Sequence, residues 1–195
     1  MGMSATQNRR WTLEEVERLM GARPGVAPRY ELVDGALLVT PAPSGRHQRI
    51  VAHLFMLLQP YVERHRLGEV RLGPSEVKLA DDDRFEPDIF VVPAVNGRRP
   101  RANAPVTRLL LAVEVLSPGS ARHDRMTKRR FFQRHGVPDY WVVDGEAEAF
   151  EIWHPSDERA ALVDEQVGWQ PGGAAAPFEL DVRGFFAGVA DEDGS

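Results

Sequence analysis

Two apolar runs in this chain each contain a single carboxylate. Asp88 lies in RFEPDIFVV (residues 84–92), directly after Pro87, and Glu114 lies in LLLAVEVL (residues 109–116). Both runs have the composition of strands buried on both faces. Removing a charge from water is costly unless a cation or hydrogen bonds compensate for it. We therefore expect a cation or a set of donors close to each carboxylate.

The two acids converge if their strands are antiparallel neighbours, because Asp88 begins its strand and Glu114 lies near the end of its own. Two carboxylates in one site repel each other, so one is protonated or a cation lies between them. Oxygen ligands of this kind favour Mg²⁺ or Mn²⁺ over zinc. Each acid alone has a plainer interpretation, since buried glutamates usually pair with arginine and aspartates after proline usually belong to turns. The occurrence of both favours a functional site.

A cationic helix is expected just beyond the second acidic strand, over SARHDRMTKRRFFQRHG. Asp124 and Lys128 are four residues apart and share a helix face. A surface ion pair with no function is the simpler reading of that spacing. The connection SPGS is short, however, so the first turns of this helix lie near Glu114. Lys128 or Arg125 is then placed to reach that carboxylate.

Charge is distributed unevenly along the chain. The net charge is −5, yet residues 98–134 carry ten basic and two acidic groups, and the rest of the chain carries 14 basic and 27 acidic groups. This asymmetry predicts a basic face that contacts backbone phosphates, although such runs are often only solvated. The candidate phosphate-binding residues on the helix are Arg122, Arg125, Arg129 and Arg130.

The remaining patterns predict a layered α/β (α+β-like) domain with a central mixed sheet flanked by helices. Helical spacing or capping signals predict helices over residues 12–20, 45–66 and 120–135, the last with Ser120 as N-cap and Gly136 beyond its end. Apolar runs predict a hairpin over 30–39 that turns at Asp34-Gly35. Further strands are expected over 69–80, with a break at Gly73-Pro74, and over 87–92, 109–116, 139–144 and 145–154.

Length and composition indicate a single domain and argue against a membrane-spanning protein, a secreted protein and cysteine chemistry. The chain of 195 residues fits one domain, which we place at 12–185 between a leader (1–11) and an acidic tail (186–195). No apolar run is long enough to span a bilayer and the N-terminus lacks a signal core, so a cytoplasmic location is expected. The absence of cysteine excludes disulfides and thiolate chemistry.

These segments together resemble the Uma-two family of the PD-(D/E)XK nuclease superfamily. The resemblance is carried by YELVDGALLVTPAPSGRHQRIVAHL, PDIFVV and VEVLSPGSARHDRMTKRRFFQRHGVPDYWVVD, in this order, and covers roughly residues 12–155. It implies a restriction-endonuclease-like core of helix, three strands, helix and strand. It also implies that Asp88 and Glu114 are the catalytic, metal-binding acids, and that Glu31 and His47 support them. Asp124 is a further supporting candidate.

One departure from the superfamily pattern concerns the catalytic lysine, which usually lies two residues after the second acid. Leu116 occupies that position here. The Uma-two pattern places the lysine on the following helix, where Lys128 stands, and Phe132 occupies a position where tyrosine is expected. His47 has the alternative reading of a cap or packed surface group.

The function expected from these residues is Mg²⁺- or Mn²⁺-dependent endonucleolytic hydrolysis of DNA, with the protein contacting the phosphate backbone. A homodimer would suit cleavage of both strands. The alternative is a nuclease-fold protein that binds nucleic acid or a protein partner without cleaving, which Leu116 and the acidic overall charge favour. A hydrolase of small phosphoesters is a weaker third reading, because no closed substrate pocket is evident in the sequence.

Overall fold

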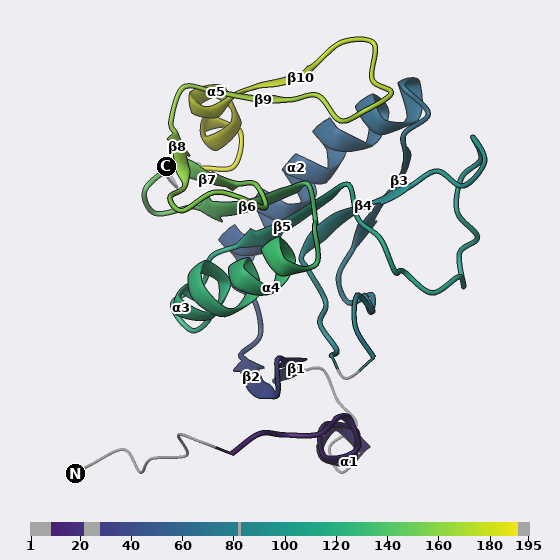
Figure 1. The fold of residues 1–195 in the computed structure, drawn as a ribbon. Coiled ribbons are helices and arrows are strands. Elements are labelled where there is room, and N and C mark those ends of the chain that lie inside the picture. The colour runs from purple at the N-terminus through teal and green to yellow at the C-terminus, as the bar shows by residue number, and fades with distance from the viewer. Residues whose placement is uncertain (1–8, 22–27, 82, 191–195) are drawn as a thin grey trace.

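A six-stranded mixed sheet forms the centre of the domain (Figure 1). The computed structural model describes residues 9–21, 28–81 and 83–190, so most of the expected leader and acidic tail lie outside the described residues. The strands, in their order across the sheet, are β3 (Gly68–Leu72), β4 (Ile89–Pro93), β5 (Leu111–Val115), β6 (Asp139–Asp144), β7 (Ala149–Trp153) and β8 (Ala161–Val163). β5 and β6 are parallel and the other neighbouring pairs are antiparallel. The predicted α/β class with a mixed sheet is confirmed.

The central strands are apolar throughout because both faces of the sheet are covered. Ile89 and Val113 point into a core that includes α2 (Gly45–Arg64) and the C-terminal elements β9 (Gln166–Trp169), β10 (Phe178–Asp181) and α5 (Val182–Ala187). Phe90 and Ala112 point the other way, into a core that contains Phe131 and Phe132. Alternation along each strand therefore separates a face toward α2 from a face toward the cationic helix.

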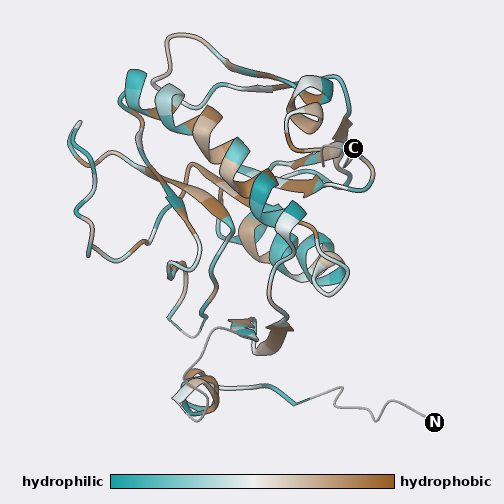
Figure 2. Ribbon diagram, turned by 180° about the vertical axis from the view of Figure 1, so that it is seen from behind, coloured by the Kyte–Doolittle hydropathy of each residue, from teal (hydrophilic) through white to brown (hydrophobic). Residues whose placement is uncertain are grey.

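Helix α2 follows the predicted amphipathic pattern. Ser44 is its N-cap and accepts a hydrogen bond from the His47 backbone N–H at 3.2 Å. Ile50, Leu54 and Leu58 are buried along its inner face, which burial of apolar surface stabilises. Seen from behind, α2 crosses the sheet with hydrophilic and hydrophobic residues along its ribbon (Figure 2). Pro60 lies inside the helix, as the sequence indicates.

The predicted hairpin forms a separate two-stranded sheet, β1 (Arg29–Val33) and β2 (Ala36–Thr40). Asp34 and Gly35 have φ values of 52° and 75°, which a two-residue I′ turn requires. Val33 and Leu38 are buried with the Phe131 side of the core, which holds the hairpin against the domain. The preceding helix α1 (Leu13–Gly21) begins with the expected capping box, in which Thr12 and Glu15 exchange hydrogen bonds of 2.9 and 3.3 Å.

The cationic helix is continuous but not uniform. It consists of α3 (Ala121–His123), a π-helical turn η1 (Asp124–Lys128) and α4 (Arg129–Arg134). In the π turn, the Arg129 N–H donates to the Asp124 carbonyl, which also accepts from the Tyr140 hydroxyl at 3.0 Å. The prediction that the Ser120 side chain caps the helix was wrong, because its Oγ accepts from the Ser117 N–H instead.

The expected strand break at Gly73-Pro74 is present. Strand β3 ends at Leu72, directly before the break, and beyond it Val77 forms only an isolated bridge with Phe85. Helix α5 runs across residue 185, where we expected the domain to end. No helix within the described residues is long and apolar enough to cross a membrane.

Candidate active site

Asp88 and Glu114 meet because their strands pair antiparallel. Ile89 lies opposite Val113, and continuing this register by one residue places Asp88 opposite Glu114. Alternation gives Asp88 the same face as Phe90, and Glu114 the same face as Ala112. Both carboxylates therefore lie on the face toward the cationic helix, where they are only 6% and 2% exposed. The structure places these two predicted residues in one site.

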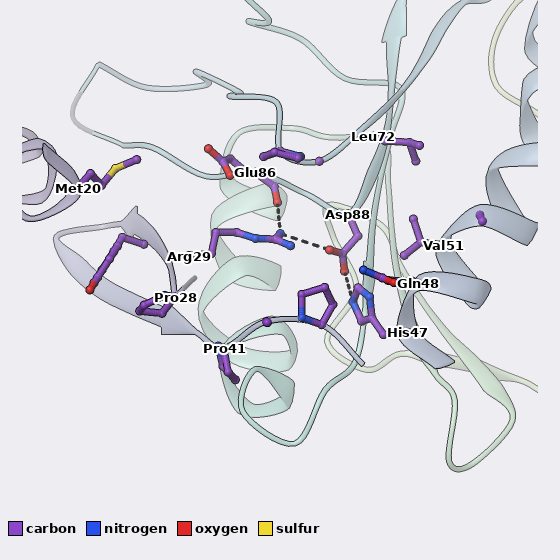
Figure 3. Close-up of a pocket in the computed structure, with 16 residues that line it drawn as sticks. Met20, Pro28, Arg29, Pro41, His47, Gln48, Val51, Leu72, Glu86 and Asp88 are labelled. Atoms are coloured by element: carbon purple, nitrogen blue, oxygen red, sulfur yellow. Dashed lines mark hydrogen bonds and ion pairs between the residues drawn. The ribbon is translucent and has the colours of Figure 1, made fainter. Parts of the chain in front are cut away.

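Asp88 is held by donors on both of its oxygens. Its Oδ2 accepts from the Val115 backbone N–H at 2.9 Å and lies 3.0 Å from His47 Nε2. Its Oδ1 lies 3.3 Å from Nη1 of Arg29, which also donates to the Glu86 carbonyl at 3.1 Å (Figure 3).

Glu114 belongs to a buried cluster built around Lys128. The ammonium lies 2.9 Å from Glu114 Oε1, 2.8 Å from Glu31 Oε2 and 3.5 Å from Asp124 Oδ1. Lys128 is only 3% exposed, so these contacts are shielded from water. The π turn contributes both Asp124 and Lys128 and directs both side chains into the cluster. Of the two cations that could reach Glu114, Lys128 is the one that does.

The hairpin supplies a side chain to each part of the site. Arg29 and Glu31 are two residues apart on β1 and therefore share a face. Glu31 binds Lys128 through one oxygen and accepts from the Glu86 backbone N–H through the other, at 2.9 Å. Arg29 contacts Asp88. Sequence reasoning missed Arg29, although its spacing from Glu31 was the signal that could have identified it.

The surroundings of Asp88 and Glu114 shift the pKa values of the two carboxyl groups in opposite directions. Burial disfavours ionisation of Asp88, but the hydrogen bond and charge of His47, the Val115 N–H and the Lys128 charge outweigh it and lower the pKa of Asp88. Burial raises the pKa of Glu114 well above its ordinary value despite Lys128, and repulsion from Asp124, Asp88 and Glu31 adds to the increase. Asp88 therefore ionises more readily than a free aspartate, and Glu114 holds a proton more strongly than a free glutamate.

The Lys128 cluster has more acids than cations. Burial opposes the charge of Lys128, but Glu114, Glu31 and Asp124 outweigh it and raise the pKa of Lys128 well above its ordinary value. Burial also raises the pKa of Asp124, against the attraction of Lys128. Among the described residues, Lys128 is thus the one ammonium in contact with three buried carboxylates, those of Glu114, Glu31 and Asp124.

The donor set suits a hard divalent cation. Asp88 and Glu114 offer carboxylate oxygens on facing strands, and the excess of negative charge around them favours a cation. No three His, Asp or Glu side chains within the described residues are arranged to hold a metal ion by themselves. Mg²⁺ typically binds through only one or two carboxylates and keeps several waters, so two acids satisfy its requirement. The residues fit Mg²⁺ or Mn²⁺ better than an ion that needs an all-protein cage.

The four candidate phosphate-binding arginines have different surroundings. Arg125 pairs with Asp144 at 2.7 Å and Glu151 at 2.5 Å, and the Arg129 guanidinium lies over the Trp153 ring. The charge of Arg125 is therefore balanced within the domain, and Arg129 packs against an aromatic ring but keeps its charge. Arg122 and Arg130 are exposed and have no ion-pair partner within the described residues.

Comparison with known proteins places this geometry in context. A family model described as Uma2, "Putative restriction endonuclease", matches residues 13–185. A solved structure titled as a putative nuclease belonging to DUF820 from Anabaena variabilis aligns with a TM-score of 0.71 at 21% identity, covering 92% of this chain and 99% of that one. At that identity the structural likeness shows the fold alone. No curated protein matches the chain significantly.

Proposed function

The chain belongs to the Uma2 family of putative restriction endonucleases, and from that premise we propose that it is a divalent-metal-dependent endonuclease that hydrolyses phosphodiester bonds in DNA. The observation that carries the proposal is the meeting of Asp88 and Glu114 on facing strands with Lys128 in contact with Glu114. Two carboxylates on one face of a sheet can hold a divalent cation, and a lysine that reaches them from the adjacent helix can stabilise charge on a phosphate.

Asp88 and Glu114 would hold the cation. A divalent cation there would lower the pKa of a bound water and polarise the scissile phosphate. His47 and the Val115 N–H keep Asp88 ionised and oriented, so that this ligand is ready at neutral pH. Glu114 has to release its proton for binding, and Lys128 favours that release.

Lys128 would stabilise negative charge that develops on the phosphate oxygens, the role of a preorganised cation in a site shielded from water. Glu31 and Asp124 orient its ammonium without reaching the reacting atoms, which makes them positioning residues. We propose that Arg122 and Arg130 contact backbone phosphates, because they are the unpaired members of the basic helix among the described residues.

The alternative is a protein of nuclease fold that binds without cleaving. It is favoured by Leu116 at the usual lysine position and by the complete engagement of Lys128 with three carboxylates. Incubation with supercoiled, linear and single-stranded DNA, in Mg²⁺ and in Mn²⁺, separates the two. Cleavage by the wild type that is lost in Asp88→Ala supports the nuclease, whereas no cleavage of any substrate with retained DNA binding supports the alternative.

A further inference from the structure

A cavity of about 760 Å³ opens beside Asp88 (Figure 3). It lies between the β1–β2 hairpin, the N-terminal turns of α2 and the turn that follows β3. Its walls are largely apolar and are formed in part by Tyr30, Pro41, Pro43, Val51, Leu72 and Pro74. A volume of this size encloses an organic molecule of about nucleotide size, and it is too small for a base-paired duplex.

The cavity is continuous with the candidate active site. Arg29, His47 and Asp88 line both this cavity and the small cavity that contains Glu114 and Lys128. A phosphate positioned at Asp88 and Glu114 would therefore have one attached nucleoside directed toward the apolar walls. A base that enters this cavity leaves the base stack, because the cavity has about the size of one nucleotide and not of a duplex.

The chemistry of the walls suits a nucleobase. The proline rings offer apolar surface for a base to pack against, and stacking on an aromatic ring such as that of Tyr30 contributes to binding with little sequence preference. Gln48 adds a side-chain amide that has no partner within the described residues and can hydrogen-bond to a base edge. Apolar walls with a few polar groups are typical of small-molecule pockets.

We propose that this cavity binds the unpaired base adjacent to the scissile phosphate, so that the substrate is single-stranded or locally melted DNA. The proposal rests on the proposed nuclease function for the position of the phosphate. Enzymes that need access to an unpaired base either act on single strands or rotate the nucleotide out of the duplex.

Equilibrium binding without turnover tests the proposal. Fluorescence anisotropy with Ca²⁺ in place of Mg²⁺ would compare a labelled single strand, a blunt duplex of the same length and a single strand of abasic nucleotides. We expect the single strand to bind about fivefold or more tightly than either of the others, since stacking of one base is worth at least about 1 kcal/mol. Equal affinity for the single strand and the abasic strand would overturn the proposal.

A cavity-filling variant gives a second readout. Ala52 is exposed and lines the cavity, so Ala52→Trp should erase the single-strand preference. Met56→Trp adds the same side chain one turn along α2, outside the cavity lining, and should keep the preference. A preference that survives in Ala52→Trp would also overturn the proposal, and thermal melts establish that both variants fold.

Failure of this proposal is distinguishable from failure of the nuclease function. Cleavage of duplex and single strand at equal rates, unchanged in Ala52→Trp, would retain the nuclease and reject the base pocket. Base-dependent binding without cleavage would retain the pocket and reject the nuclease.

Discussion

Asp88 and Glu114 face each other across two strands, but their charges are compensated in different ways. Asp88 borders the open cavity and is held by His47, Arg29 and the Val115 N–H. Glu114 lies in a closed cluster where Lys128 also binds Glu31 and Asp124. The pKa of Asp88 is lowered and that of Glu114 is raised. Asp88 is therefore next to open space, whereas Glu114 shares a buried ammonium with two other carboxylates.

The largest effect is expected from removing the centre of the closed cluster. Lys128→Met leaves three carboxylates buried without their ammonium, and breaking a buried pair in this way costs about 3–5 kcal/mol. Urea denaturation would measure the loss in the free energy of unfolding. Arg130→Met, two residues along the helix and exposed, is the control and should change stability by less than about 0.5 kcal/mol. Similarly small losses of unfolding free energy in both variants would show that Lys128 is not needed to compensate the buried carboxylates around it.

Removing the ligand on the open side should instead abolish the response to metal. Mg²⁺ at about 100 times its Kd should stabilise the wild type by about 2.7 kcal/mol, because it binds the native state alone. Asp88→Asn keeps the shape of the side chain and should be nearly insensitive to Mg²⁺ in thermal melts. Glu148→Gln, which removes an exposed carboxylate that has no contact with Asp88 or Glu114 among the described residues, should respond as the wild type does. An equal Mg²⁺ response in Asp88→Asn would show that the acid is not a ligand.

The raised pKa of Glu114 predicts a pH dependence in chelator. Because the native state binds this proton more tightly than the unfolded state, the contribution of Glu114 to stability is fully present below its ordinary pKa of 4.5 and is lost as pH rises through the raised value. As pH rises above 4.5, the free energy of unfolding of the wild type should therefore fall relative to that of Glu114→Gln. Each tenfold gain in proton affinity contributes about 1.4 kcal/mol.

Denaturation of both proteins across this pH range measures that difference. If the free energy of unfolding of the wild type does not change relative to that of Glu114→Gln, or rises with pH, then the two acids do not have the opposite environments assigned to them.

The smallest expected effect concerns Arg29, whose guanidinium contacts the oxygen of Asp88 that is not bound by His47. Arg29→Gln removes a cation that competes with Mn²⁺ for Asp88, so the variant should bind Mn²⁺ more tightly than the wild type. The increase is about tenfold if the Arg29–Asp88 interaction is worth about 1.4 kcal/mol. Isothermal titration would compare this variant with Arg46→Gln, which removes the same charge from a surface pair on α2. Unchanged or weaker Mn²⁺ binding in Arg29→Gln would indicate that Arg29 orders Asp88 without competing for it.

Local patterns in the sequence predicted most of the fold. The Asp34-Gly35 turn, the capping box at Thr12 and the apolar strands formed as expected, since each depends on neighbouring residues or on a short period. The break at Gly73-Pro74 also lies where the sequence indicates it, since β3 ends at Leu72. The Ser120 cap did not form, because the Ser120 hydroxyl accepts from the Ser117 N–H. This failure reflects competition between local alternatives that the sequence pattern does not rank.

The sequence by itself determined which residues are unusual, because a carboxylate within an apolar run is visible without any tertiary information. Asp88, Glu114 and Lys128 were identified in this way, or from the family resemblance, which also indicated Glu31 and His47. Only the tertiary structure decided which charges neutralise which. Glu31 meets Lys128, and Arg29 meets Asp88, across long stretches of chain, and Arg125 is bound to Asp144 and Glu151 away from the site. Charged side chains follow no period, so their partners are set by strand order and by the packing of the hairpin, which emerge only when the whole chain folds.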